Sequence, residues 1–519
     1  MPAPLPALWL CLHLPLLSLD ALGPWPPGVT LPALTWESDG ARGRRVHQAN
    51  AAAQALGVRA GLRLGSAQGL APHALVLARD VAREAALLDR LALALGQLSS
   101  HVVVDPPVLL VDLHASLRLF GGLRALLRRA DALIAACGLP QRRWGLAATP
   151  LAARLLAQSP ASAWAGAPRR RCTTLASTRR LIAPLPLGQL ADQGVPAEWH
   201  TPATDAMLIA LGLRRIDDLR RLPRAGLRRR GAGPWLDALD RAWGDRPDPR
   251  VLHEPPETFS LRLELAGRAD GVAPIEAAAE PLLQALCGWL HRRWQAAQGL
   301  RLSLHHEYSQ RRHLADLTLD LDLARPSRDP QHLRTLLREH LQRLELAAPV
   351  DAISLGLLRS VADHGQPVAL WPDVRTQALA HGSLIDRLQA RLGRGRVRRL
   401  QVQADARPEK ADRWVDADQA DVPPAATAAT AGHATPPTPA PPRPTWLLPQ
   451  PELLAEQHDR PLHQGRPLRL LTRAERIETG WHDGALVRRD YHVALAADGR
   501  LCWIYREPGA RWFLHGLFG

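Results

Sequence analysis

The chain has 519 residues, enough for several domains at roughly 100–200 residues each. Its hydrophobic fraction of 46% excludes a wholly disordered chain, and no run of residues reaches the ~18–20 apolar positions of a membrane span. The formal net charge is +15, and Lys410 is the only lysine, so arginine supplies a positive charge that would suit a polyanionic partner.

The first predicted element is a buried strand at residues 8–14 (LWLCLHL). The apolar run 8–19 could also be read as a secretory signal, but no basic residue precedes it and His13 and Pro15 interrupt it. The five cysteines are scattered without a C-x-x-C pair, which argues against a disulfide framework and fits a reducing compartment. We therefore expect a cytoplasmic protein.

Residues 1–165 continue with a strand-like segment at 101–113 and helical spacing at 83–98 and 123–136. Residues 166–250 are helical and arginine-rich, with a turn-bearing hairpin around 211–227. Residues 255–405 combine alternating, strand-like segments with predicted helices at 275–298 and 330–346. The pattern predicts an α+β multidomain chain.

The segment 406–446 is polar and then rich in Ala, Thr and Pro, so it cannot bury a core and predicts a flexible linker. The remaining residues, 447–519, regain aromatic side chains. They also contain turn signals at Asp483-Gly484, Asp498-Gly499 and Pro508-Gly509. This predicts a small β-rich C-terminal module.

Three segments together resemble the Y-family translesion DNA polymerases. They are 145–157 (GLAATPLAARLLA), 57–62 (GVRAGL) and 211–227 (LGLRRIDDLRRLPRAGL). The resemblance implies a right-hand architecture. The palm with fingers would span 1–165, with the fingers at about 21–80, the helix–hairpin–helix thumb would span 166–250, and the little finger 255–405.

The same resemblance implies a site where clustered carboxylates hold two Mg²⁺ ions. In this chain the matching positions carry side chains that do not suit Mg²⁺, namely Cys11, His13, Pro107 and Val108. The fingers residues that would grip a triphosphate fall on Ala51 and Gln54. Nearby acids such as Asp105 could replace one carboxylate, but not a two-metal site. We therefore expect no polymerase activity, no metal and no cofactor.

Within that superfamily, the loss resembles the ImuB family of bacterial damage-tolerance proteins. Residues 7–22, 111–122 and the tail 475–519 are similar to that family's segments. The resemblance implies a non-catalytic adaptor of SOS-induced, error-prone translesion synthesis, associated with the nucleoid and replication fork. The implied partners are the DNA sliding clamp, an error-prone C-family DNA polymerase and a RecA-like accessory protein of the ImuA type.

A hexapeptide, QPVALW, fits the bacterial clamp-binding motif through Gln366, Leu370 and Trp371. Leucine and tryptophan would fill an apolar groove, and the flanking prolines would keep the peptide extended. The alternative is a loop tryptophan packed on its own domain.

DNA phosphate contacts are expected at the palm and thumb, from Arg154, Gly212, Arg214, Arg215, Gly226 and Arg228. The alternative is a solvated arginine face in an arginine-biased chain. In the C-terminal module, Trp512, Phe513 and Phe518 are candidates for partner binding.

Two rival functions stay open. One is an active Y-family polymerase that uses unusual metal ligands. The other is a DNA-binding structural protein that has no clamp partner.

Overall fold

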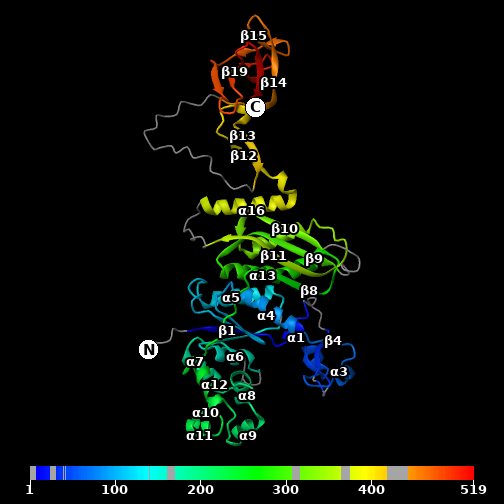
Figure 1. The fold of residues 1–519 in the computed structure, drawn as a ribbon, viewed down its shortest axis with the longest axis vertical. Coiled ribbons are helices and arrows are strands. Elements are labelled where there is room, and N and C mark those ends of the chain that lie inside the picture. Colours follow the sequence, from blue (N-terminus) through cyan, green and yellow to red (C-terminus); the bar gives the residue numbers. More distant parts are fainter. Residues whose placement is uncertain are drawn as a thin grey trace. The chain divides into compact units, whose positions relative to one another are not determined.

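The computed structural model describes residues 7–23, 31–38, 40, 43–139, 141–160, 170–306, 316–363, 374–417 and 442–519. The chain divides into two compact units, residues 1–387 and 388–519. Figure 1 shows the fold.

The first unit contains a four-stranded antiparallel sheet in the order β5-β6-β1-β7. Its strands are β1 (Trp9–His13), β5 (Val102–Asp105), β6 (Val108–Asp112) and β7 (Arg143–Ala147). Cys11 lies opposite Leu110 of β6 and Gly145 of β7. The strand predicted at the start of the chain is therefore confirmed as a central strand, which explains its nearly uninterrupted apolar sequence.

Helices cover both faces of this sheet, as Figure 1 shows. They are α1 (Leu17–Asp20), α4 (Val81–Leu95), α5 (Leu123–Ala136) and α6 (Pro150–Gln158). Because strand side chains alternate, Leu10 and Leu12 pack with α4 and α5, whereas Cys11 packs with α6. Gly145 lets α6 approach closely, since a Cβ there would lie 2.1 Å from the carbonyl oxygen of Ala153.

A small sheet in the order β3-β2-β4 occupies the region predicted as fingers. Its elements are β2 (Ala33–Ser38), β3 (Arg44–Ala49), α2 (Ala51–Ala55), α3 (Leu64–Leu70) and β4 (Leu75–Ala78). Leu34, Val46 and Val58 form its separate core. The side chain of Asn50 caps α2 by accepting a hydrogen bond from the backbone N–H of Ala53.

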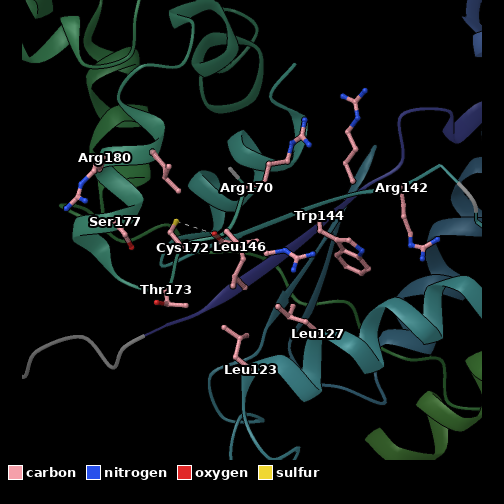
Figure 2. Close-up of a pocket in the computed structure, with 13 residues that line it drawn as sticks. Leu123, Leu127, Arg142, Trp144, Leu146, Arg170, Cys172, Thr173, Ser177 and Arg180 are labelled. Carbon is pink, nitrogen blue, oxygen red and sulfur yellow. Dashed lines mark hydrogen bonds between the residues drawn. The ribbon is translucent and has the colours of Figure 1, made fainter. Parts of the chain in front are cut away.

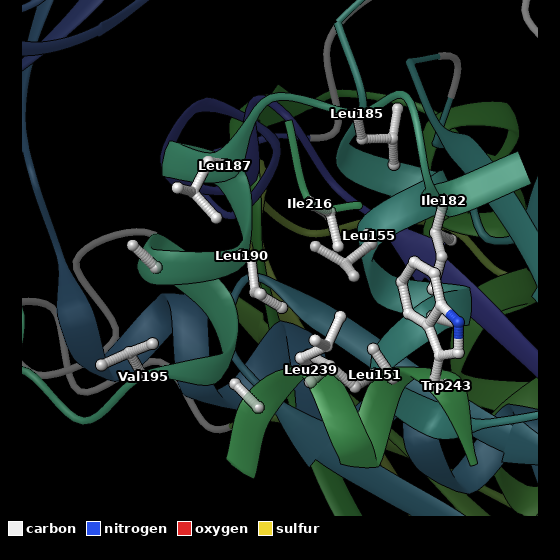
Figure 3. Packing of buried hydrophobic residues seen from close by; sticks show 14 of the residues in the cluster. Leu151, Leu155, Ile182, Leu185, Leu187, Leu190, Val195, Ile216, Leu239 and Trp243 are labelled. Carbon is white, nitrogen blue, oxygen red and sulfur yellow. The ribbon is translucent and has the colours of Figure 1, made fainter. Parts of the chain in front are cut away.

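The region predicted as the thumb is helical. Its helices are α7 (Leu175–Ile182), α8 (Leu187–Gly194), α9 (Pro202–Ala210), α10 (Asp218–Arg221), α11 (Arg224–Arg229) and α12 (Gly233–Trp243). The side chains of Thr174 and Thr201 cap α7 and α9. Figure 3 shows Leu155 of α6 among Ile182 and Leu239, so this helical part shares one core with the palm sheet.

A second antiparallel sheet, in the order β10-β9-β11-β8, packs against two helices. The elements are β8 (Ser260–Ala269), α13 (Val272–Arg292), β9 (Gln295–His306), β10 (Leu317–Ser327), α15 (Pro330–Leu341) and β11 (Val350–Ala362). The helix predicted at 275–298 was too long, because the chain reverses at Trp294, where φ is 54°, and residues from Gln295 onward pair with β11. A further helix, α16 (Val374–Leu392), crosses the boundary between the units.

The second unit begins with the hairpin of β12 (Arg398–Val402) and β13 (Asp412–Asp416), with short 3₁₀ turns η3 (Arg394–Arg396) and η4 (Pro408–Lys410). The prediction of a flexible linker was therefore wrong for residues 406–417, where ion pairs of Arg407 and Lys410 with Asp483 hold the chain. Residues 418–441 lie outside the described part of the chain.

The C-terminal module is β-rich, as predicted. Its strands are β14 (Trp446–Gln457), β15 (Arg460–His463), β16 (Arg466–Pro467), β17 (Arg469–Leu470), β18 (Glu475–Thr479), β19 (Val487–Leu495), β20 (Leu501–Arg506) and β21 (Trp512–Leu517). The chain thus has the expected α+β multidomain fold with an additional β module.

Candidate functional site

The candidate site is built around the end of β1, where the carboxylate positions of a polymerase were expected. Cys11 is fully buried against α6, and burial raises the pKa of its thiol far above the ordinary value. His13 follows on the same strand face, where burial and nearby arginines lower its pKa to about 4. Both side chains are therefore neutral near pH 7, and Cys11 is not the thiolate that metal binding requires.

Pro107 and Val108 lie across the sheet from these residues. Val108 begins β6, is fully buried, and stands opposite His13 in the register. The carbonyl oxygen of Pro107 accepts a hydrogen bond from the N–H of Leu14, at 3.2 Å. Neither side chain can ligate a cation, so these residues contribute packing and a backbone contact.

Asp105 is the carboxylate nearest to Pro107 and Val108 in the sequence. Its side chain forms ion pairs with two arginines. Its Oδ2 accepts from Nη1 of Arg154 in α6 and from Nη1 of Arg250, the latter at 3.2 Å. Arg250 also donates to Asp248 at 2.8 Å, and Asp248 accepts from the backbone N–H of Leu151 at 3.1 Å. The side chains of Arg154 and Arg250 are only 12% and 17% exposed.

This network changes the electrostatics of the site. A polymerase site concentrates negative charge, which divalent cations then neutralise. Here the guanidinium groups of Arg154 and Arg250 neutralise Asp105 themselves. Within the described residues, no group of three or more His, Cys, Asp or Glu side chains is placed to hold a metal ion.

Sequence reasoning identified Asp105 and Arg154 but missed Arg250 and Asp248. Arg250 lies 145 residues beyond Asp105, past the helical segment, and no local motif marks it. The one local feature of this segment that could have drawn attention to it is Asp248, which lies two residues before Arg250.

The thumb hairpin lies between α9 and α10, with Gly212 at φ +78° in the turn. The backbone N–H groups of Arg214 and Arg215 donate to the Asp218 carboxylate at 3.0 and 2.8 Å, and that of Gly212 donates to Ile209. Gly226 lies within α11. These N–H groups are already satisfied inside the chain, so a phosphate contact here would come mainly from side chains.

The arginines of the hairpin and of the two helices that follow it differ in whether they form ion pairs. Arg221 and Arg224 form ion pairs with Asp218 and Asp240. The nitrogen of Arg228 nearest to Asp237 is 3.9 Å from the carboxylate. Arg214 and Arg215 are exposed, and the described residues place no carboxylate within ion-pair distance of their guanidinium groups. These two are the better candidates for contact with a polyanion.

The predicted clamp peptide, with Gln366, Leu370 and Trp371, lies outside the described residues. The chain leaves the second sheet at the end of β11 and is described again from α16 onward.

The C-terminal module corrects the role expected for Trp512. This side chain is 4% exposed and belongs to the core of the module, while Phe513 and Phe518 pack partly buried against a second core cluster. An aromatic residue on alternate positions of a strand more often fills the core than a binding surface. The highly exposed aromatics are instead Trp481, at 80%, and Trp446, at 65%.

Residues 32–158 match the impB/mucB/samB family. The chain is 26% identical over 490 residues to the protein ImuB of Caulobacter vibrioides strain NA1000 / CB15N, which covers 89% of this chain and all of the relative. ImuB from strain ATCC 19089 of the same species gives the same values.

Solved structures of the Dbh DNA polymerase in an insertion ternary complex and of DinB from Sulfolobus solfataricus are also similar. Each covers 69% of this chain and all of the other chain, with 15% and 18% identity and TM-scores of 0.38 and 0.36. The family match places an impB/mucB/samB-like segment at residues 32–158 of this chain. Over most of its length the chain is similar to ImuB, and the predicted resemblance to the ImuB family is confirmed.

No helix in the described part of the chain combines the length and apolar character needed to cross a bilayer.

Proposed function

We propose that the protein is a non-catalytic adaptor of SOS-induced, error-prone translesion DNA synthesis. It links the sliding clamp to an error-prone C-family polymerase and a RecA-like accessory protein of the ImuA type. The similarity to ImuB over 89% of the chain supports this role. The observation that carries the non-catalytic part is the Asp105–Arg154–Arg250 network beside Cys11 and His13.

The network argues against the first rival, an active polymerase with unusual metal ligands. Arg154 and Arg250 already pair with Asp105, so this carboxylate is not free for a divalent cation, and neutral Cys11 and His13 offer no negative charge in its place. A two-metal site would need several carboxylates on this face of β1. Primer extension by the unmodified protein with Mg²⁺ or Mn²⁺ would support the rival and contradict this assignment.

Restoring carboxylates gives a sharper test. In the Cys11→Asp/His13→Asp variant, the two new carboxylates would lie near Arg154. Its guanidinium group would neutralise part of their negative charge. We expect no primer extension by this variant. Adding Arg154→Lys, which matches the family's palm lysine, should not restore primer extension either, because Arg250 is still present. Incorporation of a nucleotide by either variant would show that the arginines do not block metal binding.

DNA binding is part of the proposal but not its distinguishing feature. Exposed Arg214 and Arg215 can bind phosphate without reading bases. The second rival, a DNA-binding structural protein without a clamp partner, shares this property. The clamp is the partner that the rival function explicitly lacks.

The decisive measurement is therefore binding of the full-length protein to its own sliding clamp. We expect the Gln366→Ala/Leu370→Ala/Trp371→Ala variant to lose at least ten-fold in affinity, because an apolar anchor and its polar neighbour are removed together. The matched control is Trp481→Ala, which removes an exposed tryptophan from the C-terminal module. Equal binding of both variants would favour the structural protein.

A further inference from the structure

A pocket of about 880 Å³ opens beside β7, at the edge of the palm sheet. It lies between this strand, α5 and α7. Figure 2 shows Leu123 and Leu127 of α5 on one side, and Ser177 and Arg180 of α7 on another. The volume falls within the range of small-molecule sites, roughly 300–1,000 Å³.

The pocket adjoins the end of β1, because Arg143, which lines it, stands opposite His13 in the register, but its apolar part lies on the other face of the sheet. Trp144 and Leu146 face the α5 side of the sheet, where Leu146 joins the core formed with α4 and α5. Cys11 faces the opposite side, toward α6. Because successive strand residues point to opposite faces, a ligand against Trp144 would not occupy the position expected for a polymerase active site.

Positive charge dominates the lining. Five arginines contribute, namely Arg142, Arg143, Arg170, Arg171 and Arg180. One carboxylate, Asp131, approaches them, and it holds Arg142 at 2.8 Å and the indole N–H of Trp144 at 3.3 Å. For Arg143, Arg171 and Arg180, the described residues provide no carboxylate within ion-pair distance.

Arg170 shows that this crowding is unfavourable. Its Nη2 donates to the carbonyl oxygen of Ser159 at 2.9 Å, but its buried Nε has no hydrogen-bond partner in the described structure. Burial and the neighbouring Arg143 lower the pKa of Arg170. An anion between these side chains would relieve the repulsion between the guanidinium groups.

The pocket also has an apolar part. Leu123, Leu127 and Leu181 line it together with Trp144, and Thr173 and Ser177 add hydroxyl groups. Guanidinium groups match phosphate oxygens in a bidentate manner, and flat rings pack well on leucine and indole surfaces. The lining therefore suits a ligand with clustered phosphates attached to a flat, apolar group.

We propose that this pocket binds the phosphate groups of a nucleotide, with the base against Leu123, Leu127 and Trp144. Two sources share this chemistry, a free nucleoside polyphosphate and the end of a nucleic-acid strand. The base would lie on the α5 side of the sheet, opposite the face that carries Cys11, and the proposal does not depend on the adaptor function.

The test is calorimetric titration of the full-length protein with ATP, inorganic tripolyphosphate and a single-stranded DNA 12-mer, at fixed salt and without Mg²⁺. The pocket variant is Arg143→Gln/Arg171→Gln. The control is Arg466→Gln/Arg469→Gln, which removes the same charge from exposed residues of the C-terminal module. Circular dichroism verifies that both variants are folded.

We expect ATP to bind the wild type, the pocket variant to weaken it at least ten-fold, and the control to change it less than two-fold. Tripolyphosphate should bind more weakly than ATP because it lacks the base. If ATP does not bind, and the 12-mer binds the pocket variant more weakly than it binds the wild type and the control variant, the phosphate source is a nucleic-acid strand. Absent binding of all three probes, or equal losses in pocket and control variants, overturns the proposal.

Discussion

Asp105 balances two arginines within a partly buried network, and its removal tests how far that balance stabilises the fold. Asp105→Asn leaves Arg154 and Arg250 without their shared carboxylate. We expect the free energy of unfolding to fall by about 1.5–3 kcal/mol, the range for hydrogen bonds to charged groups. Urea unfolding measures the change.

The control for this variant is Asp131→Asn. Asp131 also pairs with an arginine, Arg142, but its side chain is 59% exposed. An exposed pair contributes about 0–1 kcal/mol, so the loss should be smaller. Equal losses in the two variants would mean that the network at Asp105 is no more important than a surface ion pair.

His13 gives the site a dependence on pH. Its folded-state pKa is about 4, below the ordinary value of 6.5, so between these values the unfolded chain binds a proton that the folded chain does not. Stability should therefore fall as the pH drops from 6.5 to 4, by up to roughly 3 kcal/mol at about 1.4 kcal/mol per pKa unit. In His13→Gln this part of the loss should disappear.

The measurement is chemical unfolding of wild type and His13→Gln at pH 7, 5.5 and 4. The pKa values of His253 and His515 are also lowered by burial, but these residues are common to both proteins and cancel in the difference. Parallel pH profiles would indicate that His13 is hydrated in the folded protein.

Among helices and strands, the local sequence pattern predicted an element correctly where the residues of that element alone determine it. The predicted helix at 123–136 coincides with α5, whose apolar positions recur at helical spacing. The predicted helix at 275–298 overran because Gln295 onward pairs with β11, more than 60 residues away. Such pairing depends on distant partners and leaves no local signal.

The candidate functional site shows the same difference between what local sequence predicts and what depends on distant contacts. The prediction that Cys11, His13, Pro107 and Val108 stand at carboxylate positions could be made from the sequence because it concerns residue identity within a motif. The partnership of Asp105 with Arg250 was not visible, because the fold alone brings the two together.

The segment before the C-terminal module illustrates what composition misses. Arg407 is 3% exposed by side-chain area and donates to Asp405 and to Asp483, while Glu409 pairs with Arg489 of β19 at 2.9 Å. These contacts fix η4 to the loop between β18 and β19. A polar segment can thus be ordered by ion pairs although it has almost no apolar side chains to bury.

Replacing Arg407 should loosen this connection. In the full-length protein, Arg407→Gln should increase backbone hydrogen exchange in residues 405–416 and around Asp483, because two carboxylates lose their shared donor. Arg413→Gln is the matched control, since Arg413 is exposed and contacts only Gln401 of the neighbouring strand among the hydrogen bonds described. Unchanged exchange in Arg407→Gln would show that backbone pairing of β12 with β13 is sufficient.

For the whole molecule, a net charge of +15 predicts salt-dependent binding to DNA, but it does not say which arginines take part. Many are already paired with carboxylates, so the charge available to a polyanion is smaller than the total. Residues 211–229 of the thumb region allow a direct comparison of unpaired and paired arginines within one short segment.

Arg214→Gln/Arg215→Gln removes two exposed arginines without a described carboxylate partner, whereas Arg221→Gln/Arg224→Gln removes two that pair with Asp218 and Asp240. Each phosphate contact on duplex DNA contributes about 0.9 to the slope of log K against log salt. We expect the first variant to reduce the slope by about 1.8 and the second by less than half of that, in titrations of duplex DNA from 50 to 300 mM salt. Equal reductions would mean that net charge, and not the placement of free arginines, governs DNA binding.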